Sequence, residues 1–235
     1  MMIDLPNPSS IPGLTVIGNG KLGSAVAMAW ERQGGEIARK VHQGEDWTPE
    51  GLVFEATAPE AALPNLLRCV DHGIPVVTGT TGWLHDLPLL KSHMGTKKSS
   101  VFWSTNFSPG VFALNAIAQY AAGVMAKLDN YEARISETHH IHKLDAPSGT
   151  ALTLEQHVRL GGWSESISMT SKREGDVIGF HSLAWDSDHD SVVLHHKAKS
   201  RQGFAEGAVW ALRWTWARHQ QGNFGLYTMT DLFEQ

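Results

Sequence analysis

A glycine-rich turn near the start of the chain constrains the fold more than any other feature. Its residues are Gly18-Asn19-Gly20-Lys21-Leu22-Gly23, and they follow a β-rich run at 14–17 and open a helical pattern at 22–33. The G-x-G-x-x-G spacing suits a tight turn that lets the backbone approach a pyrophosphate at a helix N-terminus. We expect the whole turn to bind a dinucleotide. A turn without any ligand is the competing interpretation.

Strand-like and helical patterns alternate through the first half of the chain. Strands are expected at 14–17, 36–41, 52–56, 75–78 and 100–103, and helices at 22–33, 59–71 and 84–94. This alternation is typical of βαβ units and a mostly parallel sheet. The connection from Val41 to Leu52 is too short for a crossover helix with its loops, so we expect this wing of the sheet to lack one.

The pattern changes after Asn106. We expect, in order, a helix at 111–127, a strand at 131–137, a polar loop to Gly149, a helix at 150–160, strands at 167–171, 178–185 and 191–198, a helix at 206–219 and a short closing element at 225–233. Consecutive strands favour a mixed or antiparallel sheet. The chain is thus expected to be an α/β protein. Residues 1–107 and 206–235 would form a Rossmann-like dinucleotide-binding domain, and residues 108–205 an α+β domain with a mixed sheet.

Composition excludes several classes of protein. The net charge is −5 and no long run carries one sign, which disfavours a nucleic-acid partner. Cys69 is the only cysteine, which excludes an internal disulfide framework. No apolar run reaches the ~18–20 residues that a bilayer requires, and the first residues do not resemble a secretory signal. We therefore expect a cytoplasmic protein without a membrane partner.

The second predicted strand ends in basic residues, where an NAD site usually carries a carboxylate. Arg39 and Lys40 stand there, and Lys21 is expected nearby. Because a guanidinium suits a ribose 2′-phosphate, this pattern favours NADPH, with NADH as a second cofactor. The alternative is a solvated strand end.

Two further segments stand at carboxyl ends of predicted strands, the edge at which open α/β sheets bind ligands. The candidate residues are Gly79, Thr80 and Thr81 in the first segment and Ser104, Thr105, Asn106 and Phe107 in the second. Small residues and hydroxyls suit contact with a nicotinamide ribose. Each segment taken alone also fits an ordinary turn.

The densest group of reactive side chains lies between positions 137 and 151. It contains His139, His140, His142 and Lys143, followed by a turn in which Ser148 is a candidate helix N-cap. Free amides at Gly149 and Thr150 would hold a carboxylate. Lys143 and a histidine would supply charge for a second carboxylate, and a proton.

A zinc site or a bland surface loop are the alternatives for this segment. The possible zinc ligands are His139, His140 and His142, with His195 or His196. Consecutive histidines point to opposite sides of a strand, however, and a lysine is a poor neighbour for a cation. We expect no metal.

The same segment resembles the signature of the 4-hydroxy-tetrahydrodipicolinate reductases, formerly dihydrodipicolinate reductases, of the diaminopimelate–lysine pathway. The matching residues are Glu137-x-His139-His140-x-His142-Lys143-x-Asp145-Ala146-Pro147-Ser148-Gly149-Thr150-Ala151. Further matches along the chain are Gly79-Thr80-Thr81-Gly82, Asn106-Phe107-Ser108-x-Gly110, Arg173-x-Gly175-Asp176 and His195-x-Lys197-Ala198-x-Ser200-Arg201. The glycine turn is one residue shorter than in many members, and a loop usual before Arg173 is missing.

The resemblance implies an NAD(P)H-dependent reductase of a cyclic dicarboxylate, built as a homotetramer through the second domain. It assigns proton transfer to His139, a catalytic role to Lys143 and a substrate contact to His140. It assigns the carboxylate-holding turn to Ser148, Gly149 and Thr150. The segments 79–81 and 104–107 match cofactor contacts.

Two other functions compete with this one. A non-catalytic NADP(H)-sensing Rossmann protein needs the glycine turn but has no use for His139 with Lys143. Another two-domain NAD(P) reductase of a small carboxylate would share the first domain and lack the turn at 145–150.

Overall fold

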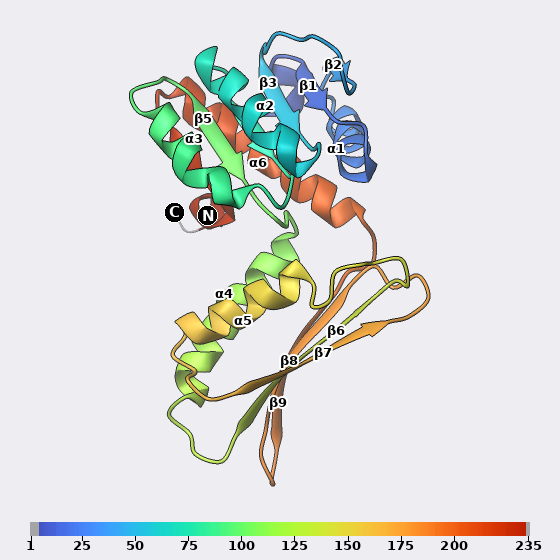
Figure 1. Ribbon diagram of the computed structural model, residues 1–235, viewed down its shortest axis with the longest axis vertical. Helices are drawn as coiled ribbons and strands as arrows, with labels where there is room; N and C mark the ends of the chain where they lie inside the picture. Colours follow the sequence, from blue (N-terminus) through green and yellow to red (C-terminus); the bar gives the residue numbers. More distant parts are fainter. Residues whose placement is uncertain (1–4, 234–235) are drawn as a thin grey trace. The chain divides into compact units, whose positions relative to one another are not determined.

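The computed structural model describes residues 5–233 and divides the chain into two compact units (Figure 1). The first unit comprises the chain up to Ser108 and from Gln202 onward, and the second comprises Pro109–Arg201. Within the described residues, no helix combines the length and apolarity needed to span a membrane.

A parallel sheet of six strands forms the first unit, in the order β10-β5-β4-β3-β1-β2. The strands are β1 Leu14–Ile17, β2 Ile37–Val41, β3 Leu52–Glu55, β4 Val76–Thr78, β5 Ser100–Trp103 and β10 Gly225–Tyr227. All neighbouring pairs are parallel, which confirms the predicted Rossmann-like sheet. Every residue of β1, β3 and β4 is buried, as expected for strands covered on both faces.

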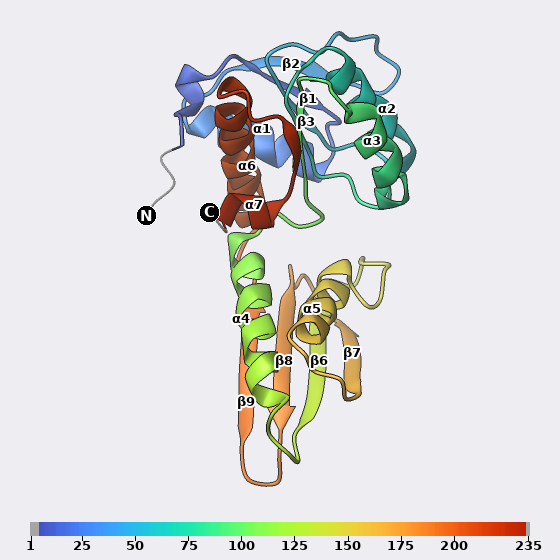
Figure 2. The ribbon, with the colours of Figure 1, turned by 90° about the vertical axis from the view of Figure 1, so that its left-hand side faces the viewer.

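Helices cover both faces of this sheet. They are α1 Lys21–Arg32, α2 Pro59–Asp71, α3 Leu87–Met94, α6 Gln202–Gln220 and α7 Met229–Phe233, with short 3₁₀ turns at Pro8–Ser10 and Leu84–Asp86. Figure 2 shows α1 and α6 on one face and α2 and α3 on the other. β2 is an edge strand, and residues 42–51 contain no helix, as the short connection predicts.

A mixed sheet forms the second unit, in the order β7-β6-β8-β9. Its strands are β6 Glu132–His139, β7 Ile167–Arg173, β8 Phe180–Asp186 and β9 Ser191–Lys197. β6 and β7 are parallel and the other pairs antiparallel, which confirms the predicted mixed sheet. The helices α4 Pro109–Met125 and α5 Gly149–Leu160 pack on one face over a core that includes Leu114, Ile135, Leu154 and Trp185 (Figure 2).

Several element boundaries differ from the sequence prediction by a few residues. β6 continues to His139, two residues beyond the predicted strand, because it pairs with β7 as far as His139 opposite Arg173. α6 begins at Gln202 rather than at 206. The polar residues at the end of β6 give no local strand signal, so cross-strand pairing decides where this strand ends.

Candidate active site

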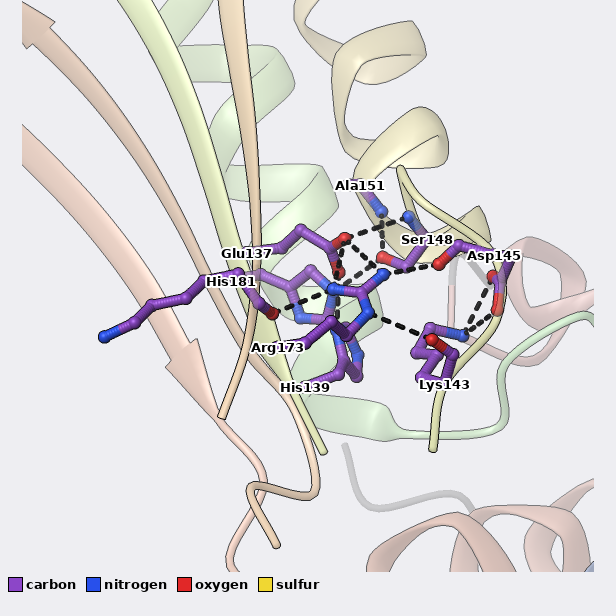
Figure 3. A network of polar contacts seen from close by, with 9 residues as sticks. Glu137, His139, Lys143, Asp145, Ser148, Ala151, Arg173 and His181 are labelled. Carbon is purple, nitrogen blue, oxygen red and sulfur yellow. Dashed lines mark hydrogen bonds and ion pairs between the residues drawn. The ribbon is translucent and has the colours of Figure 1, made fainter. Parts of the chain in front are cut away.

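The polar end of β6 supplies the centre of the candidate active site. Alternate residues of β6 are buried, so Glu137 and His139 continue the row that Ile135 begins. His181 of β8 lies opposite Glu137, and Arg173 of β7 lies opposite His139. Strand pairing thus brings four ionisable side chains from three strands to one end of the sheet (Figure 3).

Glu137 is completely buried yet well supplied with donors. Its Oε1 accepts from the Ser148 backbone N–H and from Nη1 and Nη2 of Arg173, each at 3.2 Å. Its Oε2 lies 2.5 Å from Nδ1 of His139. Burial raises the pKa of Glu137, but hydrogen bonds from Ser171 and Ser148 and the charge of His139 outweigh it and leave that pKa below its usual value. Glu137 is therefore ionised at neutral pH.

His139 packs between Glu137 and His181. The two imidazole rings meet edge to face, with centroids 5.0 Å apart and planes at 71°. Burial lowers the pKa of His139, Glu137 opposes that effect, and the charges of Lys143 and Arg173 add to it. The net pKa lies below the usual value, so the ligand-free protein favours a neutral His139 at neutral pH.

His181 connects this network to the start of α5. Its Nε2 lies 3.2 Å from Oγ of Ser148, and the same oxygen accepts from the Ala151 N–H as the N-cap of α5. Burial, followed by the charge of His139, lowers the pKa of His181 to about 4. His181 therefore stays neutral at physiological pH and adds no positive charge beside His139.

We expect acid to destabilise the protein through His181. Because its folded pKa of about 4 lies below the usual histidine pKa of 6.5, the unfolded chain binds this proton more tightly. Above pH 6.5 this difference leaves the free energy of unfolding unchanged. As the pH falls toward 4, it lowers the free energy of unfolding by up to about 3 kcal/mol. Urea denaturation of wild type and His181→Gln across this range measures it. A pH dependence unchanged in His181→Gln would refute this assignment.

The loop between β6 and α5 carries Lys143 and the predicted carboxylate turn. Lys143 Nζ binds both oxygens of Asp145, at 2.7 and 2.9 Å. The Asp145 carboxylate also takes a backbone hydrogen bond from Gly149, at the start of α5. Arg173 fastens the loop, because Nε donates to the Lys143 carbonyl at 3.2 Å and Nη2 donates to the Asp145 carbonyl.

The remaining predicted substrate residues lie around this turn. His140 is half-buried and His142 is exposed, with their rings 6.3 Å apart. Ser148 is buried as the N-cap, and Gly149 and Thr150 form the first turn of α5. Sequence reasoning missed His181, and it named Arg173 only within a family motif. The only sequence signal for these two residues was that each lies in or next to a run expected to be a strand of the second sheet.

Three of these groups also have the composition of a metal site. Donor atoms of Glu137, His139 and His181 lie within 4.8 Å of one another, and the described residues contain no other such group. Of the zinc ligands weighed from the sequence, only His139 is among them. Arg173 bound to Glu137 and the nearby charge of Lys143 oppose a further cation here. These charges make the group a poor site for a metal ion.

The glycine turn borders a cavity of about 480 Å³ in the first unit, lined by Gly18, Asn19, Gly20, the loop after β2 and residues 56–58. A Cβ at Gly18 would lie 2.2 Å from the Ala56 carbonyl oxygen, and one at Gly23 would lie 2.1 Å from the Gly18 carbonyl oxygen. Gly20, the N-cap of α1, faces open space. The turn therefore packs closely against the protein at Gly18 and Gly23 and is open at Gly20, an arrangement that fits a bound pyrophosphate.

The other predicted cofactor segments meet this turn. A Cβ at Gly79 would contact Leu22 at 2.7 Å and Phe107 at 3.1 Å, so three segments converge there. Ser104 Oγ and the Asn106 backbone form a local turn beside Phe107, and Thr81 and Thr105 are exposed.

Glu55, at the end of β3, was missed by sequence reasoning. It is fully buried and accepts from Oγ1 of Thr78 at 2.5 Å, from Oγ1 of Thr80 at 2.8 Å and from the Thr57 N–H at 3.1 Å. Its place at the end of an apolar strand was the available signal. Glu55 thus fixes the hydroxyl-bearing segment that includes Thr80.

Neither basic residue at the end of β2 lines the 480 Å³ cavity. Arg39 Nη2 donates to the Asp46 carbonyl at 2.8 Å, and Lys40 lines a smaller hollow of about 180 Å³ with Gly18 and Ser24. His42 lines the larger cavity instead, with Nδ1 3.1 Å from the Asn19 side-chain nitrogen. The sequence did not single out His42.

Comparisons with known proteins decide the family. Residues 110–233 match the model described as "Dihydrodipicolinate reductase, C-terminus", and residues 46–107 match "Dihydrodipicolinate reductase, N-terminus". The chain belongs to this family. A curated 4-hydroxy-tetrahydrodipicolinate reductase from Christiangramia forsetii is 35% identical over 93% of this chain and 96% of its own length.

Other members of the dihydrodipicolinate reductase family agree with this assignment. The 4-hydroxy-tetrahydrodipicolinate reductase of Thiobacillus denitrificans is 34% identical over 92% of this chain and 85% of its own length. The solved structure of dipicolinate-bound dihydrodipicolinate reductase from Paenisporosarcina sp. TG-14 has a TM-score of 0.70, with 17% identity, 94% of this chain and 98% of that chain covered. That structure shows the shared fold. The family resemblance inferred from segment 137–151 is confirmed.

Proposed function

We propose that this protein reduces 4-hydroxy-tetrahydrodipicolinate to tetrahydrodipicolinate with NADPH or NADH, in diaminopimelate and lysine biosynthesis. The observation that carries this proposal is a buried His139 in contact with Glu137, on the strand that leads into a cationic, carboxylate-binding loop. The family's curated relatives bear the name of this activity. A protein that only senses NADP(H) has no use for such a network.

The donors of the loop suit a substrate with two carboxylates. Lys143 Nζ and the Gly149 amide already hold a carboxylate, that of Asp145. A substrate carboxylate would compete with Asp145 for these donors. Ser148 is the N-cap of α5 and Thr150 lies in its first turn, and His140 is the first residue of the loop.

His139 is the proton donor in this proposal. The nicotinamide cofactor, held at the glycine turn and the segments 79–81 and 104–107, supplies a hydride when bound. The 4-hydroxyl first leaves as water together with a proton from the neighbouring carbon, assisted by Lys143, which gives a conjugated imine. Hydride then adds to the carbon that carried the hydroxyl, Lys143 stabilises the developing negative charge, and His139 protonates the neighbouring carbon. Two substrate carboxylates would raise the pKa of His139 from its lowered ligand-free value and so favour the protonated donor.

A coupled assay tests the activity. Pyruvate and aspartate semialdehyde are condensed in situ by a synthase, and loss of NAD(P)H absorbance is followed. We expect oxidation only when both precursors and the protein are present. Oxidation with a simple 2-keto acid in their place would indicate another two-domain reductase, and no oxidation with any substrate would favour the sensing protein.

We further propose that NADPH is used at least as well as NADH. The positive charge of Arg39 near the end of β2, where NAD sites usually carry a carboxylate, supports this proposal, because a guanidinium suits a 2′-phosphate. Arg39→Ala is expected to raise KM for NADPH far more than KM for NADH, with His42→Ala as the comparison on the cavity wall. Equal effects of Arg39→Ala on both cofactors would refute a role in 2′-phosphate recognition.

Activity should not depend on a metal ion. Because Glu137, His139 and His181 are interpreted as handling a proton, dialysis against a strong chelator is expected to leave kcat unchanged. Metal analysis of the purified protein accompanies the assay. Stoichiometric zinc together with lost activity on its removal would overturn this interpretation.

We also propose a homotetramer in the cytoplasm. An apolar stripe supports self-association, because Ile117, Tyr120 and Val124 share one face of α4 and are exposed, as are Val192 and Val193 on β9. Light scattering coupled to size exclusion measures the assembly.

A further inference from the structure

The position of the Glu137 carboxylate determines which ring nitrogen of His139 carries the hydrogen. Oε1 is taken by donors of Arg173 and Ser148, and Oε2 lies 2.5 Å from Nδ1 of His139. An ionised carboxylate can only accept a hydrogen bond, so Nδ1 must carry a hydrogen. The neutral ring then has its lone pair on Nε2, and the protonated ring has its transferable proton there.

The opposite edge of the ring is kept open by a glycine. A Cβ at Gly179 would lie 3.3 Å from Nε2 of His139, closer than most Cβ contacts in proteins, and 3.6 Å from its Cδ2, an ordinary contact distance. Among the described residues, Nε2 of His139 has no hydrogen-bond partner, whereas Nδ1 faces Glu137. One nitrogen is anchored and the other faces a position without a side chain.

We propose that Glu137 is a positioning residue that fixes His139 with its hydrogen on Nδ1, so that Nε2 is the atom that passes the proton. Gly179 keeps Nε2 accessible. This inference rests on the proposed function, in which His139 is the proton donor. Glu137 does not touch the substrate in this account. It orients the imidazole and stabilises the charged ring, as carboxylates do for other proton-transferring histidines.

The first test reads the tautomer directly and needs no activity. Nitrogen-15 NMR of histidine-labelled protein, with the His139 signals identified by their loss in His139→Ala, separates the two neutral forms. We expect Nδ1 of neutral His139 to be protonated and Nε2 to be unprotonated, and Glu137→Gln to give a mixture. A wild-type His139 protonated on Nε2 would refute the proposal.

The second test asks whether Glu137 acts through His139. Glu137→Gln keeps the shape and removes the charge, and we expect kcat to fall by ~10²-fold while KM for both substrates changes by less than about threefold. In a His139→Ala background the same change should alter kcat by less than about threefold. An equal loss in both backgrounds would indicate a general structural role and contradict the proposal.

Gly179→Ala tests the proposal independently, in case Glu137→Gln does not fold, by asking whether Nε2 of His139 must be accessible. The added methyl crowds Nε2 without touching Glu137, so kcat should fall by about tenfold in wild type and stay unchanged in His139→Ala. Gly203→Ala is the matched control, because a Cβ there meets nothing within 4 Å. Wild-type kcat in Gly179→Ala would refute an open Nε2.

These outcomes separate this inference from the proposed function. A wild-type protein without reductase activity would refute the function and leave the tautomer measurement valid. An active wild type with a fully active His139→Ala would remove His139 as the donor. An inactive His139→Ala beside a Glu137→Gln of normal kcat would refute the role of Glu137 alone.

Discussion

His139→Ala and Lys143→Ala are each expected to lower kcat by ~10²–10⁴, the range typical of losing a positioned acid or base. His139 contacts the Glu137 carboxylate, and Lys143 is the cation of the adjoining loop. The Kd for NADPH should not change, because the glycine turn belongs to the other unit. The measurements are kcat, KM and cofactor Kd, with thermal melts to confirm folding.

His142→Ala is the control for this pair. His142 lies in the same loop but is exposed, whereas His139 is buried at the end of β6. We assign His142 no direct role, and we expect His142→Ala to lower kcat less than His139→Ala or Lys143→Ala does. A His139→Ala variant with near-normal kcat, or a His142→Ala variant worse than the other two, would require a different proton donor within this segment.

Arg173→Ala is expected to lower the free energy of unfolding by about 3 kcal/mol. The change leaves the fully buried Glu137 carboxylate without its two guanidinium hydrogen bonds. It also releases the carbonyls of Lys143 and Asp145, which hold the loop in place. Urea denaturation measures the loss, and kcat should fall with it because the loop carries Lys143.

Arg134→Ala gives the matched comparison on the neighbouring strand. Arg134 pairs with Asp186 at 3.0 Å, but its side chain is 56% exposed. Ion pairs of this kind contribute ~0–1 kcal/mol, so the loss should be much smaller. Similar losses for Arg173→Ala and Arg134→Ala would mean that burial of Glu137 does not set the strength of the Arg173 pair.

Local patterns were enough to predict the architecture of both units. The strand, glycine turn and helix at 14–33 appear as β1 and α1, and the missing crossover helix follows from the length of the connection between β2 and β3. Consecutive strand-like runs predicted the mixed sheet of the second unit. Alternation, turn residues and connection lengths act over short stretches of chain, so a sequence displays them directly.

The polar network around Glu137 was only half visible in the sequence. His139 and Lys143 stood out as a dense cluster, but the strand was expected to end at Glu137, and His181 carried no signal of its own. The β6–β8 register places His181 opposite Glu137, and the β6–β7 register places Arg173 opposite His139. These pairings join residues far apart along the chain, and no local pattern fixes a register between distant strands.

In the candidate cofactor region, too, the sequence determined some features and the tertiary structure decided others. The sequence determined the close-packed glycine turn, because only glycine fits where a Cβ would strike a carbonyl oxygen. The tertiary structure decided that His42, rather than Arg39 or Lys40, lines the cavity beside that turn. It also decided that His181 is neutral, because burial lowers its pKa, and that Glu137 is ionised, because hydrogen bonds and nearby positive charge outweigh its burial. Sequence thus determined which reactive groups the chain carries, and tertiary structure decided their partners and charges.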